Sequence, residues 1–205
     1  MSIPNLWLFA ATEAALSLSP GPAVIMTVAY GITRGVRGAL WVTSGILGAN
    51  ALYFALSATS LGGLIAASPQ LYHYLKWAGA AYLVYLGLSA IFGRPSPITL
   101  SKLNVKAQSG WAILRGAALL QLSNPKSLLM FVSILPQFVD PDQPVGMQMV
   151  VLAACSIIPE FFILLGYGAL ASRASHRLTQ PEFAVITERV AGCLVLAAGL
   201  MVASI

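Results

Sequence analysis

The chain has 205 residues, of which 58% are apolar and only 8% are charged, and its mean hydropathy is +0.83. Soluble domains carry about a quarter charged residues, so this composition excludes a water-soluble globular protein and indicates a membrane protein. A net charge of +5 is also typical of nucleic-acid-binding proteins, but most basic residues here lie in short loops, where they set membrane orientation. We therefore expect no nucleic-acid partner.

The first apolar segment, residues 6–30, contains Glu13 and is interrupted by Leu18-Ser19-Pro20-Gly21-Pro22. No basic residue precedes it, and it is longer than the apolar region of a signal peptide. We interpret it as the first membrane span rather than as a cleaved signal.

Further apolar segments follow at short intervals, and each is long enough to cross a bilayer, which takes about 20 helical residues. The short connections leave no room for a soluble domain. We therefore predict an all-α fold in which residues 1–205 form one membrane-embedded domain, a polytopic bundle of six transmembrane helices. The six segments are residues 6–30, 40–67, 71–92, 112–138, 147–172 and 184–205.

Loop charges predict the orientation of this bundle. Basic residues lie in or beside the connections that follow the first, third and fifth segments, whereas another connection holds Asp140 and Asp142. Because cytoplasmic loops carry the excess of Lys and Arg, both termini are expected to be periplasmic. The basic residues are Arg34, Arg37, Arg94, Lys102, Lys106, Arg115, Arg173, Arg177 and Arg189.

A weak internal repeat is visible. Aligning Leu18-Ser19 with Leu122-Ser123 also aligns Met26 with Met130, and further on Gly87-Leu88 resembles Gly199-Leu200. The repeat halves would be residues 1–92 and 112–205. Three spans per half is an odd number, so the halves would be inverted relative to one another, a frequent plan among transporters.

Lys126 lies about halfway along the apolar segment 112–138, and Glu13 and Glu160 lie within other apolar segments. A charge at that depth costs roughly 2.5–3.5 kcal/mol on insertion scales, so an ionisable residue there indicates a functional site. A structural ion pair between Lys126 and Glu160 is the alternative, and the two roles are compatible.

Prolines interrupt two segments at corresponding places, at Pro20 and Pro22 in the first and at Pro125 in the fourth. Proline cannot donate a backbone hydrogen bond, so a carbonyl about one turn earlier is freed. Such groups are tolerated at membrane depth where they line a cavity or are buried in protein, and the new helix N-termini suit a carboxylate. A plain packing kink is the alternative.

The second segment offers Asn50 and Tyr53 as polar groups of a pocket or as partners in hydrogen bonds between helices. Small residues spaced by four let another helix approach closely, which predicts that Ser44 and Gly48 lie at such a contact.

These motifs together resemble the lysine exporter superfamily, specifically its homoserine/threonine efflux (LysE/RhtB-type) branch of bacterial inner-membrane carriers. They cover nearly the whole chain in the expected order. The motifs are Leu18-Ser19-Pro20-Gly21-Pro22, Gly45-Ile46-Leu47-Gly48, the run from Ala78 to Gly87, Asn124-Pro125-Lys126, and Leu135-Pro136-Gln137-Phe138-Val139-Asp140-Pro141.

The resemblance implies export of amino acids or close derivatives such as homoserine, threonine or leucine, by antiport with protons. The sequence itself contains no nucleophile–base constellation, phosphate loop or metal cluster, so we expect a carrier rather than an enzyme, and no cofactor. Members often carry an acid after the second glycine of span two, where Gly48-Ala49-Asn50 has none, and many have aspartate where this chain has Glu160. We expect Glu160 or Glu13 to couple transport to protons. The expected substrate-binding and coupling residues are Glu13, Pro20, Gly21, Pro22, Asn50, Tyr53, Asn124, Pro125, Lys126 and Glu160.

Other classes of membrane protein fit the sequence less well. A membrane cation exporter predicts His- or Asp-rich loops or acid pairs within spans, and a thiol–disulfide electron carrier predicts two cysteines that can meet. Cys155 and Cys193 are expected to be small core residues near opposite faces, and no metal-ligand spacing is present. A purely structural subunit does not account for Lys126. The small-residue faces permit a homodimer.

Overall fold

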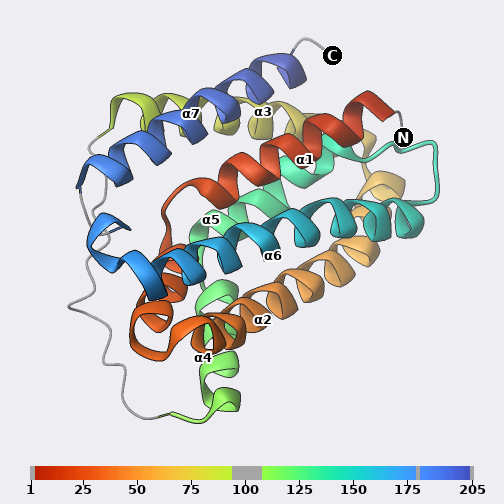
Figure 1. The fold of residues 1–205 in the computed structure, drawn as a ribbon. Coiled ribbons are helices and arrows are strands. Elements are labelled where there is room, and N and C mark those ends of the chain that lie inside the picture. The colour runs from red at the N-terminus through yellow and green to blue at the C-terminus, as the bar shows by residue number, and fades with distance from the viewer. Residues whose placement is uncertain (1–2, 94–107, 179–180, 204–205) are drawn as a thin grey trace.

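The computed structural model describes residues 3–93, 108–178 and 181–203, and within these ranges every regular element is a helix (Figure 1). Most are α-helices, while η2 is a π-helix and η3 a 3₁₀-helix. The elements are α1 Ile3–Leu18, α2 Pro22–Ala67, α3 Pro69–Phe92, α4 Gly110–Leu122, α5 Pro125–Leu129, η2 Met130–Ile134, η3 Leu135–Phe138, α6 Val145–Leu178 and α7 Pro181–Ala203.

All six apolar segments are helical in the described residues, and the first and fourth are interrupted at the predicted prolines. By length and composition, two described helical stretches qualify as membrane spans, Pro22–Ser60, which includes the turn at Gly35 described below, and Val145–Arg173. The stretches Gly110–Leu122 and Pro125–Phe138 meet at 53° and make a third if counted as one bent span. The chain is therefore an all-helical membrane protein.

The expected loop between the first two segments is a single turn at Gly35. The residues on both sides of it, including Arg34 and Arg37, are helical, and Gly35 alone has non-helical angles, φ 64° and ψ −165°. A positive φ is accessible to glycine without the steric penalty that other residues suffer. One glycine thus reverses the chain where the sequence predicted a longer connection.

The described helix ends fall into two groups (Figure 1). The Gly35 turn, the ends of α3 and α6 and the starts of α4 and α7 lie toward the left and lower side of the view. The α2–α3 junction, the start of α6 and both marked chain ends lie at the opposite side. The connections predicted to be basic are thus flanked by helix ends at one end of the bundle, which we call the basic end.

The bundle is held together by close contacts between α2 and both α4 and α6, and between α3 and α7. At the α2–α4 contact the decisive residue is Gly45, because a Cβ there would lie 2.2 Å from the carbonyl oxygen of Leu114. The prediction that Ser44 and Gly48 lie at a close contact with another helix of the chain is wrong. Ser44 is exposed, and a Cβ on Gly48 would meet no atom within 4 Å.

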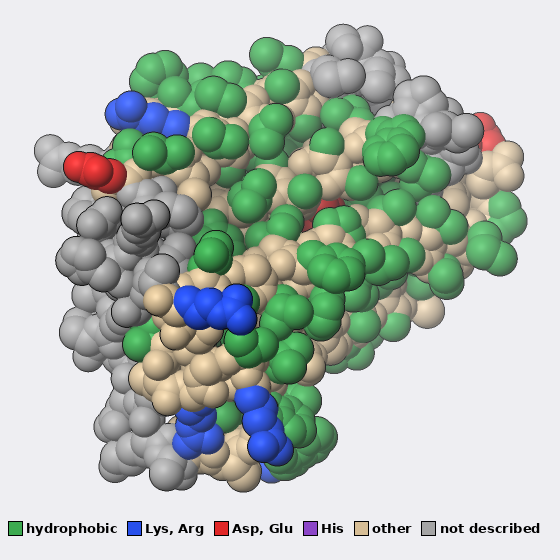
Figure 2. Space-filling model, in the orientation of Figure 1, with side chains coloured by type: hydrophobic (Ala, Val, Ile, Leu, Met, Phe, Trp, Pro, Cys, Tyr) green, Lys and Arg blue, Asp and Glu red, His purple; other side chains and the backbone are tan. Residues whose placement is uncertain are grey.

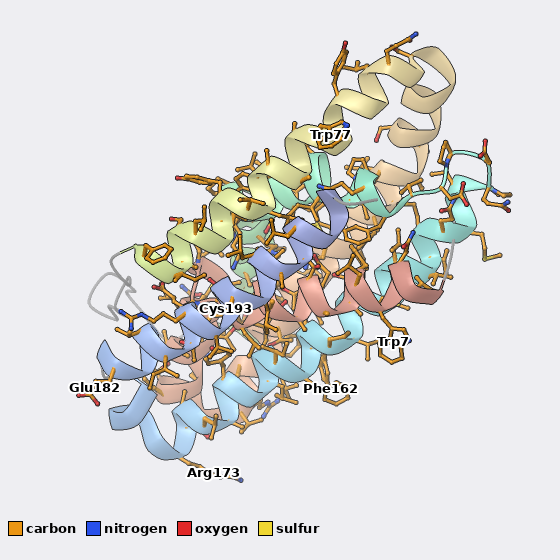
Figure 3. All side chains as sticks on the ribbon, turned by 90° about the horizontal axis from the view of Figure 1, so that it is seen from above. Trp7, Trp77, Phe162, Arg173, Glu182 and Cys193 are labelled. Atoms are coloured by element: carbon orange, nitrogen blue, oxygen red, sulfur yellow. The ribbon has the colours of Figure 1, made fainter. Side chains whose placement is uncertain are left out.

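Large apolar side chains cover much of the surface, as Figure 2 shows for one face, with Lys and Arg gathered at its left and lower edges. Figure 3 shows Arg173 and Glu182 at the basic end and Trp7 and Trp77 toward the other. Phe162 and Leu119 are each 65% exposed, which in water is costly but in lipid is expected. Cys155 packs partly buried against the core, whereas Cys193 is exposed on α7, so the core expectation is wrong for Cys193.

Candidate functional site

The break between α1 and α2 frees a carbonyl that Lys126 occupies. In a continuous helix the N–H of residue 20 would bond to the carbonyl of Leu16, but Pro20 has no N–H. The ammonium nitrogen of Lys126 lies 2.5 Å from this Leu16 oxygen and 3.4 Å from the carbonyl oxygen of Ser19. Carbonyls at a helix C-terminus carry partial negative charge, so they stabilise the cation.

Two tyrosines each satisfy one carbonyl at the breaks. Pro22 frees the carbonyl of Leu18 in the same way, and the hydroxyl of Tyr167 in α6 donates to it at 2.8 Å. At the break between α4 and α5, the hydroxyl of Tyr53 donates to the carbonyl of Leu122 at 2.8 Å. The Tyr53 ring stacks on Phe131 with ring centroids 4.7 Å apart, which holds the hydroxyl in place.

Glu13 is buried between α1 and α6, with 6% of its surface exposed. Its Oε2 accepts a hydrogen bond of 2.7 Å from the hydroxyl of Ser156. Its Oε1 is buried and has no hydrogen-bond partner among the described residues. A buried carboxylate with one free oxygen is costly, so this atom is available to a proton or to a donor from a ligand.

Glu160 begins a chain of side-chain hydrogen bonds that ends at the second helix break. Its Oε2 accepts from the amide of Asn50 at 2.6 Å, and the carbonyl oxygen of Asn50 accepts from Gln121 at 2.8 Å. Gln121 in turn accepts from the amide of Asn124 at 3.3 Å, and Asn124 caps α5 by accepting from the backbone N–H of Lys126. All four side chains are buried, so the chain links α6, α2 and the α4–α5 break rigidly.

Lys126 does not form the direct ion pair considered from the sequence. Among the described residues, its ammonium contacts are the two backbone oxygens, whereas the carboxylates of Glu160 and Glu13 act on it through space. The charges therefore surround a gap rather than cancelling in contact.

That gap is a cavity of about 60 Å³. A volume of this size holds a few water molecules, whereas ligand pockets usually start at about 300 Å³. A bound amino acid therefore requires the helices around it to separate. Besides the ionisable residues the wall is formed by small and apolar side chains; the lining is Glu13, Leu16, Ser17, Ser19, Gly21, Ala23, Val24, Asn50, Gln121, Asn124, Lys126, Ser127, Met130, Phe131, Glu160 and Leu164.

The structure brings most of the expected site residues to this cavity. Six of the ten line it, and the three prolines form the breaks beside it. Tyr53 does not line the cavity, but its hydroxyl bonds the carbonyl of Leu122 at the second break. Three residues that support the site, Gln121, Ser156 and Tyr167, are not among those predicted from the sequence. Gln121 had a signal, since it is an amide in an apolar segment one turn before Asn124. Ser156 and Tyr167 had none beyond their polarity.

Buried charges of both signs around a central cavity, at the breaks of two discontinuous helices in a membrane protein, are typical of a membrane transporter. The chain belongs to the LysE type translocator family, which matches residues 14–204. The family is one of transporters.

Its relatives include amino-acid exporters. The chain is 32% identical over 200 residues to the homoserine/homoserine lactone efflux protein of Salmonella typhimurium, covering 97% of this chain and 96% of the relative. It is 29% identical over 161 residues to the leucine efflux protein of Salmonella choleraesuis, with 78% and 76% covered. An uncharacterized membrane protein of Vibrio cholerae is 29% identical over 201 residues, with 98% and 97% covered. No solved structure matches the chain.

Proposed function

We propose that this protein exports small amino acids or close derivatives, of the homoserine, threonine or leucine kind, across a bacterial plasma membrane by antiport with protons. The observation that carries the proposal is the central cavity, which presents Lys126, Glu13 and Glu160 at the break between α1 and α2. An amino acid carries an ammonium group and a carboxylate group on the same carbon. A cavity with one cation and two acids on its wall complements both charges.

The substrate carboxylate binds at Lys126 and at the first turn of α2. The first N–H groups of a helix have no partners within the helix and carry partial positive charge, and Ala23 and Val24 of that turn line the cavity. The ammonium group faces Glu160 or the free oxygen of Glu13. The apolar residues Met130, Phe131 and Leu164 face the side chain of the substrate.

Coupling follows from competition for an acid. With substrate bound, the carboxylate pairs with the ammonium group. A proton arriving from the periplasm neutralises the carboxylate, the ammonium loses its partner and the substrate leaves outward. The proton is then released to the cytoplasm when the empty carrier returns. One proton thus enters the cell each time the carboxylate is protonated and deprotonated.

We further propose six spans in a 3+3 inverted repeat, with both termini periplasmic. Two reciprocal contacts support the repeat. Gly87 of α3 packs on Leu196 of α7 and Gly199 of α7 packs on Val84 of α3, and the separation between Val84 and Leu196 equals that between Gly87 and Gly199. The two tyrosine bonds end on Leu18 and Leu122, the residues that the sequence repeat aligns. Rocking of one half against the other supplies alternating access.

Transport into everted membrane vesicles tests the function. Vesicles from cells that express the protein are given an acid interior, and uptake of labelled homoserine, threonine, leucine and homoserine lactone is followed. We expect accumulation of at least one of these compounds, abolished by an uncoupler and absent from vesicles of cells without the protein. No accumulation of any amino acid or lactone would refute the proposed substrate class.

A further inference from the structure

A second cavity, of about 290 Å³, shares Lys126 with the central cavity but is lined by neither Glu13 nor Glu160. The ends of α1 and α3, the start of α5 and the middle of α7 surround it. Its wall includes Leu86, Ser89, Gly93, Glu188 and Val195. Since α3 ends and α7 begins at the basic end of the bundle, this cavity lies between that end and the central cavity (Figure 1).

The two cavities meet at one contact. Leu16, Ser19 and Lys126 line both of them. The bond from the Lys126 ammonium to the Leu16 carbonyl therefore forms part of the partition between them. An ammonium has three donors on a flexible four-carbon stem, so the same group can serve a ligand on either side.

The second cavity also carries charges of both signs. Glu188 is partly buried on its wall and acts through space on Lys126. Leu86, Ala191 and Val195 supply an apolar surface between α3 and α7. The volume approaches that of ordinary small-ligand pockets, unlike the central cavity. A carboxylate, an ammonium group and an apolar wall in a space of this size fit a small zwitterion.

We propose that this cavity is a second substrate subsite on the cytoplasmic side of Lys126, in which Glu188 takes the α-ammonium group of an amino acid and Lys126 takes its carboxylate. The inference rests on the proposed function, because it assigns where the exported compound first binds. When Lys126 leaves the Leu16 carbonyl with the carboxylate, the partition opens and the amino acid passes to Glu160 and Glu13. An amino-acid lactone lacks the carboxylate, so Glu188 alone holds it by the ammonium.

Transport kinetics in everted vesicles test the subsite. We expect Glu188→Gln to raise the apparent KM for homoserine from the cytoplasmic side by about tenfold, the loss of one charge-assisted hydrogen bond, while the maximal rate changes less than twofold. Homoserine lactone should show the same rise in KM, and Glu188→Asp should restore most of the affinity. Glu182→Gln is the matched control, because Glu182 lies in the first turn of the same helix and is exposed.

Each outcome separates the subsite from the function. If the wild type transports homoserine and Glu188→Gln has the same KM for it, the subsite is overturned and the proposed function stands. A fall in maximal rate at constant KM would also overturn it, because a binding group must act on KM. Absence of transport in the wild type would refute the proposed function instead.

A labelling experiment tests binding at the subsite without measuring transport and without changing Glu188. Ser89 is exposed on the cavity wall, so Ser89→Cys, combined with Cys155→Ala and Cys193→Ala, accepts a charged maleimide from the basic end. We expect homoserine to slow this labelling at least threefold and to leave Ser172→Cys, exposed on α6, unchanged. Equal rates at Ser89→Cys with and without homoserine would contradict the subsite.

Discussion

Tyr53 of α2 and Tyr167 of α6 make matching hydrogen bonds, Tyr53 to the end of α4 and Tyr167 to the end of α1. Each hydroxyl donates over 2.8 Å to a leucine carbonyl at a helix break, Tyr53 to Leu122 and Tyr167 to Leu18. Each tyrosine comes from a long helix, and each acceptor comes from a distant part of the chain. The breaks beside the central cavity are thus held by side chains of other helices, and these bonds also join α2 to α4 and α6 to α1.

Replacing either tyrosine by phenylalanine removes one of these bonds and leaves a carbonyl without its donor. Such a loss costs about 1–3 kcal/mol, and each kcal/mol lowers the melting temperature of a chain this size by about 2–4 °C. We expect Tyr53→Phe and Tyr167→Phe each to melt earlier in detergent and to transport more slowly. Tyr85→Phe is the control, since Tyr85 is 64% exposed. Unchanged melting of both variants would show that the bonds contribute nothing.

Glu160→Gln tests proton coupling. The side chain keeps its size and can still accept from Asn50, so the hydrogen-bond chain to Asn124 persists and the protein should fold. It cannot release a proton, so we expect uptake driven by an acid vesicle interior to vanish while exchange of labelled for unlabelled substrate continues. Asp142→Asn, in an exposed loop, should behave as wild type. Full proton-driven uptake by Glu160→Gln would move the coupling role to Glu13.

The pair Lys126 and Glu160 separates charge balance from substrate binding. If Lys126 only balances the acids, Lys126→Met together with Glu160→Gln should recover most of what Lys126→Met alone loses, because an unpaired buried charge costs about 3–5 kcal/mol and a missing pair little. We expect a double variant that inserts and melts closer to the wild-type temperature than Lys126→Met alone, still lowered by the lost donor to the Leu16 carbonyl, and that shows neither transport nor exchange. Exchange at the rate of Glu160→Gln alone would show that Lys126 does not hold the substrate.

Gly45 and Gly48 are three residues apart in α2 and should respond oppositely to alanine. A Cβ at Gly45 would lie 2.2 Å from the Leu114 carbonyl oxygen, whereas one at Gly48 meets nothing. Overpacking typically costs about 1–3 kcal/mol. We expect Gly45→Ala to lower the melting temperature by several degrees, roughly the shift that such a cost implies. Gly48→Ala should not, because alanine favours a helix over glycine. Equal melting of the two variants would contradict the α2–α4 contact.

The orientation of the chain can be tested with fusions. A reporter that is active only in the periplasm should work when fused after residue 205 and fail when inserted between residues 93 and 110. A reporter active only in the cytoplasm should give the opposite result and serves as the control. A working periplasmic reporter in the 93–110 connection would contradict both the orientation and the assignment of the second cavity to the cytoplasmic side.

Much of the site was predictable because its causes are local. Apolar composition determines the solvent in which the helices are stable, and proline breaks a helix wherever it stands, so the helical class and the two breaks followed from sequence alone. Lys126, Glu13 and Glu160 were recognisable because a charge in an apolar segment is costly whatever lies around it. The close approach in α2 was misplaced from Gly45 to Gly48, because spacing alone does not tell which face of a helix meets its neighbour.

The partners of those residues were decided by the tertiary structure. Leu16 lies 110 residues before Lys126, and Asn50 lies 110 residues before Glu160. Nothing local selects a carbonyl rather than Glu160 as the acceptor for Lys126, or Tyr167 as the donor to Leu18. The packing of α3 against α7 places Glu188 beside the cavity that Lys126 also lines. Sequence by itself determined which groups had to be satisfied inside the membrane; packing of distant helices determined what satisfies them.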